Sequence, residues 1–306
     1  MEGQKPKADT GVGPLSVSEL QKQLFSDHIY LNIGRQLRRR FPGAVIIVSQ
    51  RVPDSDVVRL RFYEGFGSFL DAIFNMLGRR FEDMDFKADS EALTVMPSGK
   101  VYQLTGGFFQ LALGEVPYAI AGLIENILAI NKIYAVAFVR NQEVLGTAVL
   151  ILRHKDDISE TDKTEIEAYS KECAILLEEV NSKTRVLFLD DELNILDMVK
   201  EMLLDEGFDV SVASSGNEAV TSYKNKMKSG YKYDIVITDV TLGRGMNGIK
   251  TAAEILKLDT HASLICCTGN ILGDAYKNYK SFGYKSFLKK PFTIEEIQEA
   301  IKTAGK

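Results

Sequence analysis

The stretch VITDVTLGRGMNG, residues 236–248, decides the fold of the C-terminal third of the chain. A short apolar run ends within it at Asp239, and a glycine-rich loop separates this run from the next helical pattern. Similar apolar runs alternate with helical patterns on both sides of it, at residues 186–189, 209–213, 264–267 and 286–288. Buried strands that alternate with helices predict an α/β fold, a doubly wound five-stranded parallel sheet covered on both faces.

Polar residues stand where these predicted strands end. Asp190 and Asp191 follow the first strand, and Asp239 ends the third. Thr268 ends the fourth, and Lys290 follows the fifth. Each could have a purely structural role, as a helix cap, a turn residue or an exposed charge. The carboxyl ends of parallel strands share one edge of the sheet, where sites form, so we expect the five side chains to lie together.

The chemistry of this set favours phosphoryl transfer. Clustered carboxylates repel one another unless a hard cation neutralises them, and Mg²⁺ prefers oxygen ligands. An aspartate beside such an ion can attack phosphorus and form an acyl phosphate. The Lys290 ammonium and the Thr268 hydroxyl would then bind oxygens of the transferred group.

Residues 185–306 resemble the receiver domain of two-component response regulators. The resemblance rests on VITDVTLGRGMNG together with VLFLDDE (186–192), CTG (267–269) and FLKKPF (287–292). It implies a flavodoxin-like fold and a partner histidine kinase or phosphotransfer protein. It also implies that Asp239 accepts the phosphoryl group and that Mg²⁺ is the cofactor. The implied metal ligands are Asp190, Asp191, Asp239 and the backbone carbonyl of Thr241.

Further roles follow from the same resemblance. Thr268 matches the switch hydroxyl, and Lys290, not Lys289, matches the lysine before a proline. Phe287 matches the aromatic residue that rotates on activation, and Lys290-Pro291 is expected to be a cis peptide bond. The loop after the acceptor departs from the family pattern, because it lacks the usual proline and is one residue longer. Its residues Gly243 and Gly245 predict a mobile loop. Whether the loop affects partner recognition or the lifetime of the phosphoryl group is left open.

The N-terminal part shows a different pattern. Residues 1–15 are polar and unpatterned and predict a flexible tail. Helical patterns lie at Ser16–Phe41, Ser68–Phe81, Tyr118–Ile130 and Glu160–Val180, and strand patterns at 44–52, 57–63, 92–96, 100–104, 133–139 and 144–152. Pro42-Gly43 ends the first helix, whose cationic residues 38–40 suit a helix C-terminus. Ser159 and Asp162 predict a short capping box for the last helix.

Residues 16–182 resemble a GAF domain, an α+β fold built on an antiparallel sheet. The resemblance rests on the first helix, the hairpin of residues 44–63 and, above all, the closing hairpin and helix of residues 134–179. It implies a sensory module that binds small ligands such as cyclic nucleotides, haem or bilins, or a module that only dimerises. We expect the linker, residues 181–184, to be short, before the receiver-like part begins at residue 185.

Candidate ligand-binding residues in this part each have a plainer interpretation. Cys173 is the only cysteine that a bilin could use, and His28 and His154 are interpreted as surface or interface residues rather than haem ligands. Thr105-Gly106-Gly107 could approach a phosphate or form a turn. Aromatic side chains could line a pocket or pack in the core, namely Phe66, Phe69, Phe108, Phe109 and Tyr118. No ligand is assigned from the sequence.

Helix pairing across a homodimer is a further expectation of the GAF resemblance. The apolar positions of the first and last helices could form this interface or cover the domain's own sheet. They are Leu20, Leu24, Leu31, Leu176 and Val180.

Composition narrows the class of protein. The net charge of −5 gives no basic excess for binding DNA. No apolar run approaches the ~20 residues that cross a bilayer, and the N-terminus lacks the pattern of a signal peptide, so we expect a cytoplasmic protein that does not bind membranes. Three cysteines, two of them adjacent, imply no disulfide framework.

These observations predict a phosphorelay signalling protein with no enzymatic activity beyond self-catalysed phosphorylation and dephosphorylation. The downstream partner is not indicated. The alternative is a ligand-binding sensor or scaffold in which the GAF-like part is the main functional module. A haloacid-type hydrolase is disfavoured. Such an enzyme would have a second aspartate two residues after the first, but the residue two positions after Asp190 is Glu192.

Overall fold

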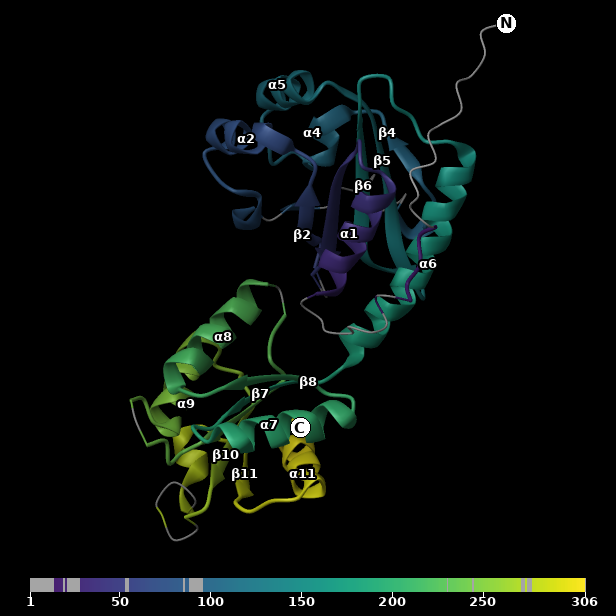
Figure 1. Cartoon of the computed structure of the whole chain (residues 1–306). Coiled ribbons are helices and arrows are strands. Elements are labelled where there is room, and N and C mark those ends of the chain that lie inside the picture. Colours follow the sequence, from purple (N-terminus) through teal and green to yellow (C-terminus); the bar gives the residue numbers. More distant parts are fainter. Residues whose placement is uncertain are drawn as a thin grey trace, which may run out of the picture. The chain divides into compact units, whose positions relative to one another are not determined.

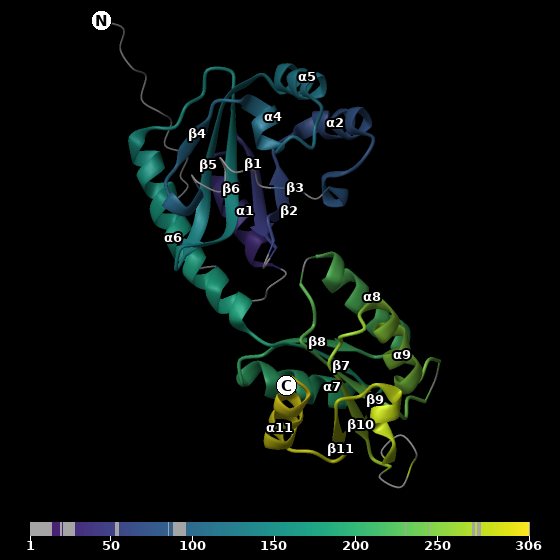
Figure 2. The same cartoon turned by 180° about the vertical axis from the view of Figure 1, so that it is seen from behind.

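The computed structural model describes residues 14–18, 20, 28–52, 55–84, 86–87, 96–229, 231–243, 245–270, 273 and 277–305. It divides into two compact units, Met1–Asn181 and Ser182–Lys306. Figures 1 and 2 show the elements of each unit from opposite sides. The two units are considered separately.

The N-terminal unit is built on a six-stranded antiparallel sheet with the order β3-β2-β1-β6-β5-β4. Its longest hairpin joins β5 and β6 through Asn141 and Gln142, which have φ angles of 50° and 67°. Two turn residues with positive φ are typical of a type I′ hairpin, so this predicted hairpin is confirmed. The strands are β1 Val45–Arg51, β2 Val57–Glu64, β3 Phe86–Lys87, β4 Tyr102–Leu104, β5 Ile130–Arg140 and β6 Glu143–Arg153.

Side chains alternate between the two faces of this sheet. Ile46 and Val48 of β1 pack against α1 (Ile29–Arg40) and α6 (Glu160–Ser182) in one core. Val45 and Ile47 point to the other face and pack in a second core. The elements over that second face are α2 Leu70–Leu77, α4 Gly107–Leu111, α5 Tyr118–Leu128 and the 3₁₀ segments η2 Gly67–Phe69 and η3 Phe81–Asp83, with η4 Met96–Ser98 lying near β5 and β6.

The first helix is shorter than the sequence predicts. It begins at Ile29, whereas the expected start at Ser16 is wrong, because residues 14–18 and 20 form coil and turns. The Ser18 amide donates to the Ser16 hydroxyl at 3.3 Å, a local bond that competes with helix formation. The helix ends at Arg40, as its cluster of arginines predicted. Residues 19 and 21–27 lie outside the described part.

The predicted capping box of α6 is confirmed. The Asp162 amide donates to the Ser159 hydroxyl at 3.1 Å, and the Ser159 amide donates back to the Asp162 carboxylate at 2.8 Å. Arg40 of α1 also forms an ion pair with Asp162 at 2.9 Å. The cap therefore fixes both the start of α6 and its contact with α1.

Two further element boundaries in the N-terminal unit differ from those predicted from the sequence. The helix expected at Ser68–Phe81 ends at Leu77, because Gly78 takes a left-handed conformation, φ 67°. Of the strand expected at 92–96, Met96 lies in η4 and the other residues lie outside the described part.

The C-terminal unit is a five-stranded parallel sheet with the order β11-β10-β9-β7-β8, the 2-1-3-4-5 order of flavodoxin-like folds. Helices α7 and α11 pack on one face, and α8 and α9 on the other, which confirms the predicted doubly wound architecture. The strands are β7 Arg185–Leu189, β8 Asp209–Ala213, β9 Ile235–Asp239, β10 Leu264–Thr268 and β11 Ser286–Lys289. The helices are α7 Leu193–Asp205, α8 Gly216–Lys228, α9 Gly248–Leu258, the 3₁₀ segment η5 Tyr279–Phe282 and α11 Ile294–Ala304.

Two expectations for this unit need correction. The strands are not all fully buried, because the edge strand β11 alternates between buried and exposed residues and the edge strand β8 has two partly accessible residues, Ser211 and Val212. The helix expected at 273–282 is described only as η5 and the residues next to it, and residues 274–276 lie outside the described part.

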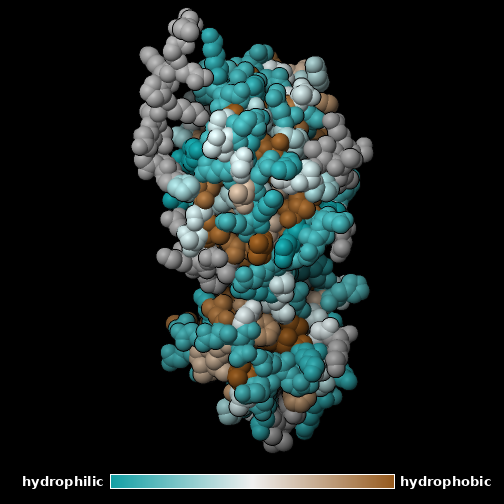
Figure 3. All heavy atoms as spheres, turned by 90° about the vertical axis from the view of Figure 1, so that its right-hand side faces the viewer, coloured by the Kyte–Doolittle hydropathy of each residue, from teal (hydrophilic) through white to brown (hydrophobic). Residues whose placement is uncertain are grey.

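The face of the molecule seen in Figure 3 is mostly hydrophilic, with apolar residues in small patches. Scattered apolar residues of this kind are normal on protein surfaces. Among the helices that the structure describes, none is long and apolar enough to cross a bilayer.

Two helical glycines test the packing of the N-terminal unit. A Cβ at Gly34 of α1 would overlap the Phe62 ring, whereas a Cβ at Gly122 of α5 would meet nothing within 4 Å. We expect Gly34→Ala to destabilise the unit by about 1–3 kcal/mol through overpacking. Gly122→Ala, the matched control, should be neutral or stabilise by up to ~1 kcal/mol through helix propensity. Urea unfolding measures both, and equal stability of the two variants would contradict the described contact of α1 with β2.

Candidate functional site

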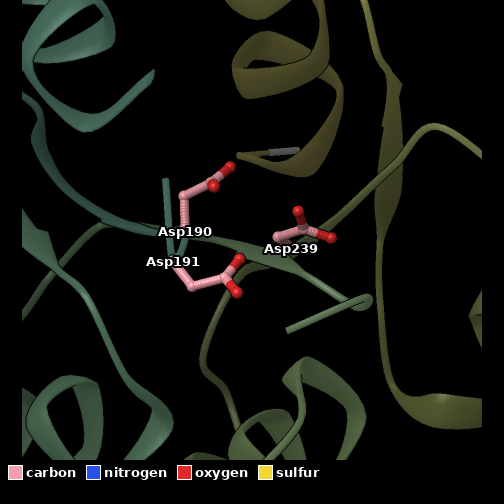
Figure 4. Close-up of side chains that lie close together, drawn as sticks. All are labelled: Asp190, Asp191 and Asp239. Atoms are coloured by element: carbon pink, nitrogen blue, oxygen red, sulfur yellow. The ribbon is translucent and has the colours of Figure 1, made fainter. Parts of the chain in front are cut away.

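Three carboxylates meet at the carboxyl ends of adjacent strands in the C-terminal unit (Figure 4). Asp190 follows β7, Asp239 ends β9, and these two strands pair directly. Ligand oxygens of Asp190, Asp191 and Asp239 lie within 4.8 Å of one another. Asp190 is 0% and Asp239 3% exposed, while Asp191 lies at the surface. The structure therefore brings the predicted acidic residues together.

Lys290 neutralises part of this charge. Its ammonium lies 2.6 Å from Oδ2 of Asp190 and also donates to Oδ2 of Asp239. Burial alone would lower the pKa of Lys290, but the hydrogen bonds and charges of the two aspartates outweigh it and raise that pKa. A raised pKa means that the lysine keeps its positive charge well above neutral pH. The cis Lys290-Pro291 bond expected from the resemblance is present.

The Asp239 carboxylate is held on both oxygens. The amide and the hydroxyl of Thr241 each donate to Oδ1 of Asp239 at 2.7 Å. Oδ2 faces Lys290. Sequence reasoning assigned Thr241 only a metal-binding carbonyl, and that role stays a prediction. Sequence reasoning missed its contact with Asp239, although aspartate side chains in turns commonly accept a hydrogen bond from the backbone amide two residues on.

The two remaining predicted residues lie on neighbouring strands. Thr268 ends β10, is 1% exposed and accepts a hydrogen bond from the Asn270 amide at 3.0 Å. Phe287 of β11 is 39% exposed, with its ring centroid 5.5 Å from that of Tyr279. Burial next to Asp239 raises the pKa of the Cys266 thiol to about 11, so this nearby sulfur stays protonated at neutral pH.

The loop that departs from the family pattern reaches the acidic cluster. The Gly243 amide donates to Oδ2 of Asp191 at 2.9 Å, and a Cβ at Gly243 would lie 3.1 Å from the same oxygen. The sequence predicted only mobility here, because hydrogen bonds between separate loops leave no local signal. Gly248 is a second constraint, since a Cβ there would overlap the carbonyl oxygen of Asp239 where α9 begins against β9.

The donor set fits a hard divalent cation. Three carboxylates converge, one of them at the surface where an ion and its waters could enter. Mg²⁺ is usually bound by one or two carboxylates, with water or phosphate completing an octahedron. Asp190, Asp191 and Asp239 could together supply such ligands.

The candidate ligand-binding residues of the N-terminal unit do not form a comparable cluster among the described residues. The Phe108 amide donates to Oε1 of Glu125 at 2.6 Å, and a Cβ at Gly107 would overlap that carboxylate. An acidic group thus stands where a phosphate would bind, which favours the turn interpretation of Thr105-Gly106-Gly107. His28 and His154 are exposed, as interpreted from the sequence.

The five aromatic residues with two open interpretations, pocket or core, take different places in the structure. Phe69, Phe109 and Tyr118 are exposed by 37% or more, and Phe66 packs in the core. Only Phe108 among the five lines the cavity that the structure describes in this unit. Of the two interpretations, the pocket is thus supported for Phe108 and core packing for Phe66, while Phe69, Phe109 and Tyr118 are largely exposed.

Cys173 and the apolar helix positions lie inside the unit. Cys173 is buried in the core beneath α1 and α6, where burial raises the pKa of its thiol. Leu20, Leu176 and Val180 are buried in the same core, and Leu31 packs against it. These positions cover the unit's own sheet, the second of the two interpretations, and a homodimer stays a prediction. Leu24 lies outside the described residues.

Comparison with known proteins places one family in the C-terminal unit. Residues 186–302 match the family model described as response regulator receiver domain. The chain is 34% identical over 125 residues to the chemotaxis protein CheY of Thermotoga maritima, covering 40% of this chain and 98% of that protein. It is 32% identical over 127 residues to CheY of Listeria monocytogenes, with shares of 40% and 98%.

A third relative is the transcriptional regulatory protein PdtaR of Mycobacterium tuberculosis. It is 34% identical over 121 residues, which cover 39% of this chain and 56% of that protein. The family match begins at residue 186, so the GAF resemblance of residues 16–182 stays a prediction.

Removal of one carboxylate charge tests the metal site. We expect Asp191→Asn to weaken Mg²⁺ binding at least about tenfold, because a charged ligand becomes neutral. Asp197→Asn is the matched control, since Asp197 is exposed on α7 and lies outside the acidic cluster. Isothermal titration with Mg²⁺ measures both. Equal Mg²⁺ affinity of the two variants would remove Asp191 from the metal site.

Proposed function

The chain belongs to the response regulator receiver family through residues 186–302, and we propose that its C-terminal unit accepts a phosphoryl group on Asp239. One observation carries the assignment of the acceptor. Asp239 is the carboxylate of the cluster that contacts the Lys290 ammonium through Oδ2 and accepts hydrogen bonds from the Thr241 amide and hydroxyl through Oδ1. A nucleophile set between a cation and an acidic pair suits phosphoryl transfer.

The donor is a phosphohistidine of a partner histidine kinase or phosphotransfer protein. An oxygen of Asp239 attacks phosphorus, a P–O bond forms, and the P–N bond breaks with its electron pair leaving on the imidazole. The product is an acyl phosphate on Asp239. Hydrogen bonds from Thr241 and Lys290 hold the carboxylate before the attack, so little reorientation is needed.

Charge on the transferred group is balanced by side chains already at the site. Lys290 would turn from the carboxylate to a phosphoryl oxygen, and the Thr268 hydroxyl would donate to another. A bound Mg²⁺, held by Asp190, Asp191, Asp239 and the Thr241 carbonyl, would supply further positive charge beside the phosphoryl group. These residues act by position and charge, as phosphoryl transfer requires.

Phosphorylation would then change the surface of β11. Movement of the Thr268 hydroxyl towards the phosphoryl group would free space beside the strand, and Phe287 would turn into it. Phe287 is 39% exposed and contacts Tyr279, so its rotation would alter a surface available to a downstream protein. The identity of that protein is not part of the proposal.

The N-terminal part, residues 16–182, is proposed to be a GAF-like sensory module of a cytoplasmic protein, preceded by a tail at residues 1–15. Its antiparallel sheet with helices on both faces supports this role. Helix α6 continues to Ser182, and β7 begins at Arg185, so the connection to the receiver at residues 185–306 is short. In the alternative, this module is the main functional part and the receiver modulates it. A cavity within the N-terminal unit is the observation that supports this alternative.

Acetyl phosphate labelling tests the acceptor. With Mg²⁺ present, we expect a slower-migrating species on Phos-tag gels for the wild type and for Asp205→Ala, an exposed control on α7. Asp239→Ala should give no such species. Lys290→Ala should be labelled about 10²-fold more slowly, because a charged group that stabilises the transferred phosphoryl is lost. Equal labelling of Asp239→Ala and the wild type would refute the assignment.

A further inference from the structure

A cavity of about 270 Å³ lies in the N-terminal unit. Its floor is the sheet face opposite α1 and α6, with Ile47 of β1, Ala135 of β5 and Val149 of β6. Phe81 of η3 and Phe108 of α4 stand among the residues on the other side. Figures 1 and 2 show the short helical segments that lie over this face of the sheet. The cavity belongs to one unit and does not involve the receiver.

The lining is largely apolar and carries no charge. Of the described residues that line the cavity, none is Asp, Glu, Lys, Arg or His. Burial of a phosphate or carboxylate against these residues would leave the anion without a cationic partner, which costs several kcal/mol. The described part of the lining therefore disfavours anionic ligands.

One polar feature stands in the floor. Ser49 of β1 and Thr147 of β6 are directly paired residues, and their hydroxyl oxygens lie 2.6 Å apart. The side chains line the cavity and the residues are only 5% and 6% exposed. Because one hydroxyl donates to the other, the pair still has one O–H to donate. A ligand with a single hydrogen-bond acceptor would match it.

We propose that this cavity binds a small neutral molecule, mostly apolar and about the size of a two-ring compound, with one polar atom bonded to Ser49 and Thr147. The size follows from volume, since an apolar cavity of roughly 150 Å³ admits benzene. The proposal deepens the sensory role proposed for residues 16–182 by giving the chemical class of its ligand. It does not depend on phosphorylation of Asp239.

The ligand types implied by the GAF resemblance fit this cavity poorly. A cyclic nucleotide carries a phosphate, for which no cationic side chain lines the described cavity. Cys173, the cysteine that a bilin would need, lies in the core on the opposite face of the sheet. His28 and His154 are exposed and do not line the cavity, which removes them as haem ligands.

Matched probes test the ligand class on the full chain. The probes are 1-naphthol, naphthalene, 1-naphthoate and cyclic GMP, and calorimetric titration measures their affinities. We expect 1-naphthol to bind saturably, naphthalene to bind about fivefold more weakly for lack of the hydrogen bond, and the two anions not to bind. Binding of 1-naphthoate or cyclic GMP in preference to 1-naphthol, or no binding of any probe, would overturn the proposal.

Two variants locate the binding. Ala135→Leu extends into the cavity, so 1-naphthol affinity should fall at least tenfold while the unfolding temperature holds or rises, since empty space is filled. Undiminished affinity in this variant would place the ligand elsewhere.

The double variant Ser49→Ala, Thr147→Val removes both hydroxyls, a change that can be nearly neutral for stability because neither partner is left unpaired. It should abolish the fivefold preference for 1-naphthol over naphthalene and leave naphthalene affinity unchanged. A preference that persists would refute the role of the hydroxyl pair, whatever the outcome with Ala135→Leu.

Asp239→Ala separates this inference from the receiver function. The variant should bind 1-naphthol with wild-type affinity, because Asp239 lies in the other unit. A loss of 1-naphthol binding in Asp239→Ala would contradict a cavity confined to the N-terminal unit, whereas a failure of phosphorylation alone would leave it intact.

Discussion

The contact of the Lys290 ammonium with Asp190 and Asp239 is the interaction on which the receiver unit depends. Both carboxylates are almost fully buried at one sheet edge, where burying a charge is costly without an opposite charge nearby. Lys290 comes from beyond β11, so its position requires that β7, β9, β10 and β11 pair in register. The charges therefore tie distant parts of the sequence to one place and supply the chemistry proposed for it.

Backbone groups complete this edge. The amide of Thr241 holds Asp239, and the amide of Gly243 holds Asp191. The start of α9 approaches β9 so closely that only glycine fits at position 248. The loop between Asp239 and α9 thus contacts both Asp239 and Asp191.

The N-terminal unit uses the two faces of its sheet differently. Beneath α1 and α6 the face is filled by apolar side chains, including positions first interpreted as a dimer interface. The other face is covered by short helical segments and keeps a cavity that holds a hydroxyl pair. Close packing of this kind is normal for protein interiors, which leave few voids.

From the amino-acid sequence alone one can predict the doubly wound receiver fold, the meeting of Asp190, Asp191, Asp239 and Lys290, the β5–β6 hairpin and the cap of α6. These features have local signals: apolar periodicity, turn residues, and polar residues at strand ends that any parallel sheet brings to one edge. Tertiary structure decided the start of α1, the contacts of Thr241 and Gly243, the burial of Leu176 and Val180, and which aromatic residues line the cavity. Those depend on which faces meet across long sequence separations, and the pattern of a single segment does not encode its partner.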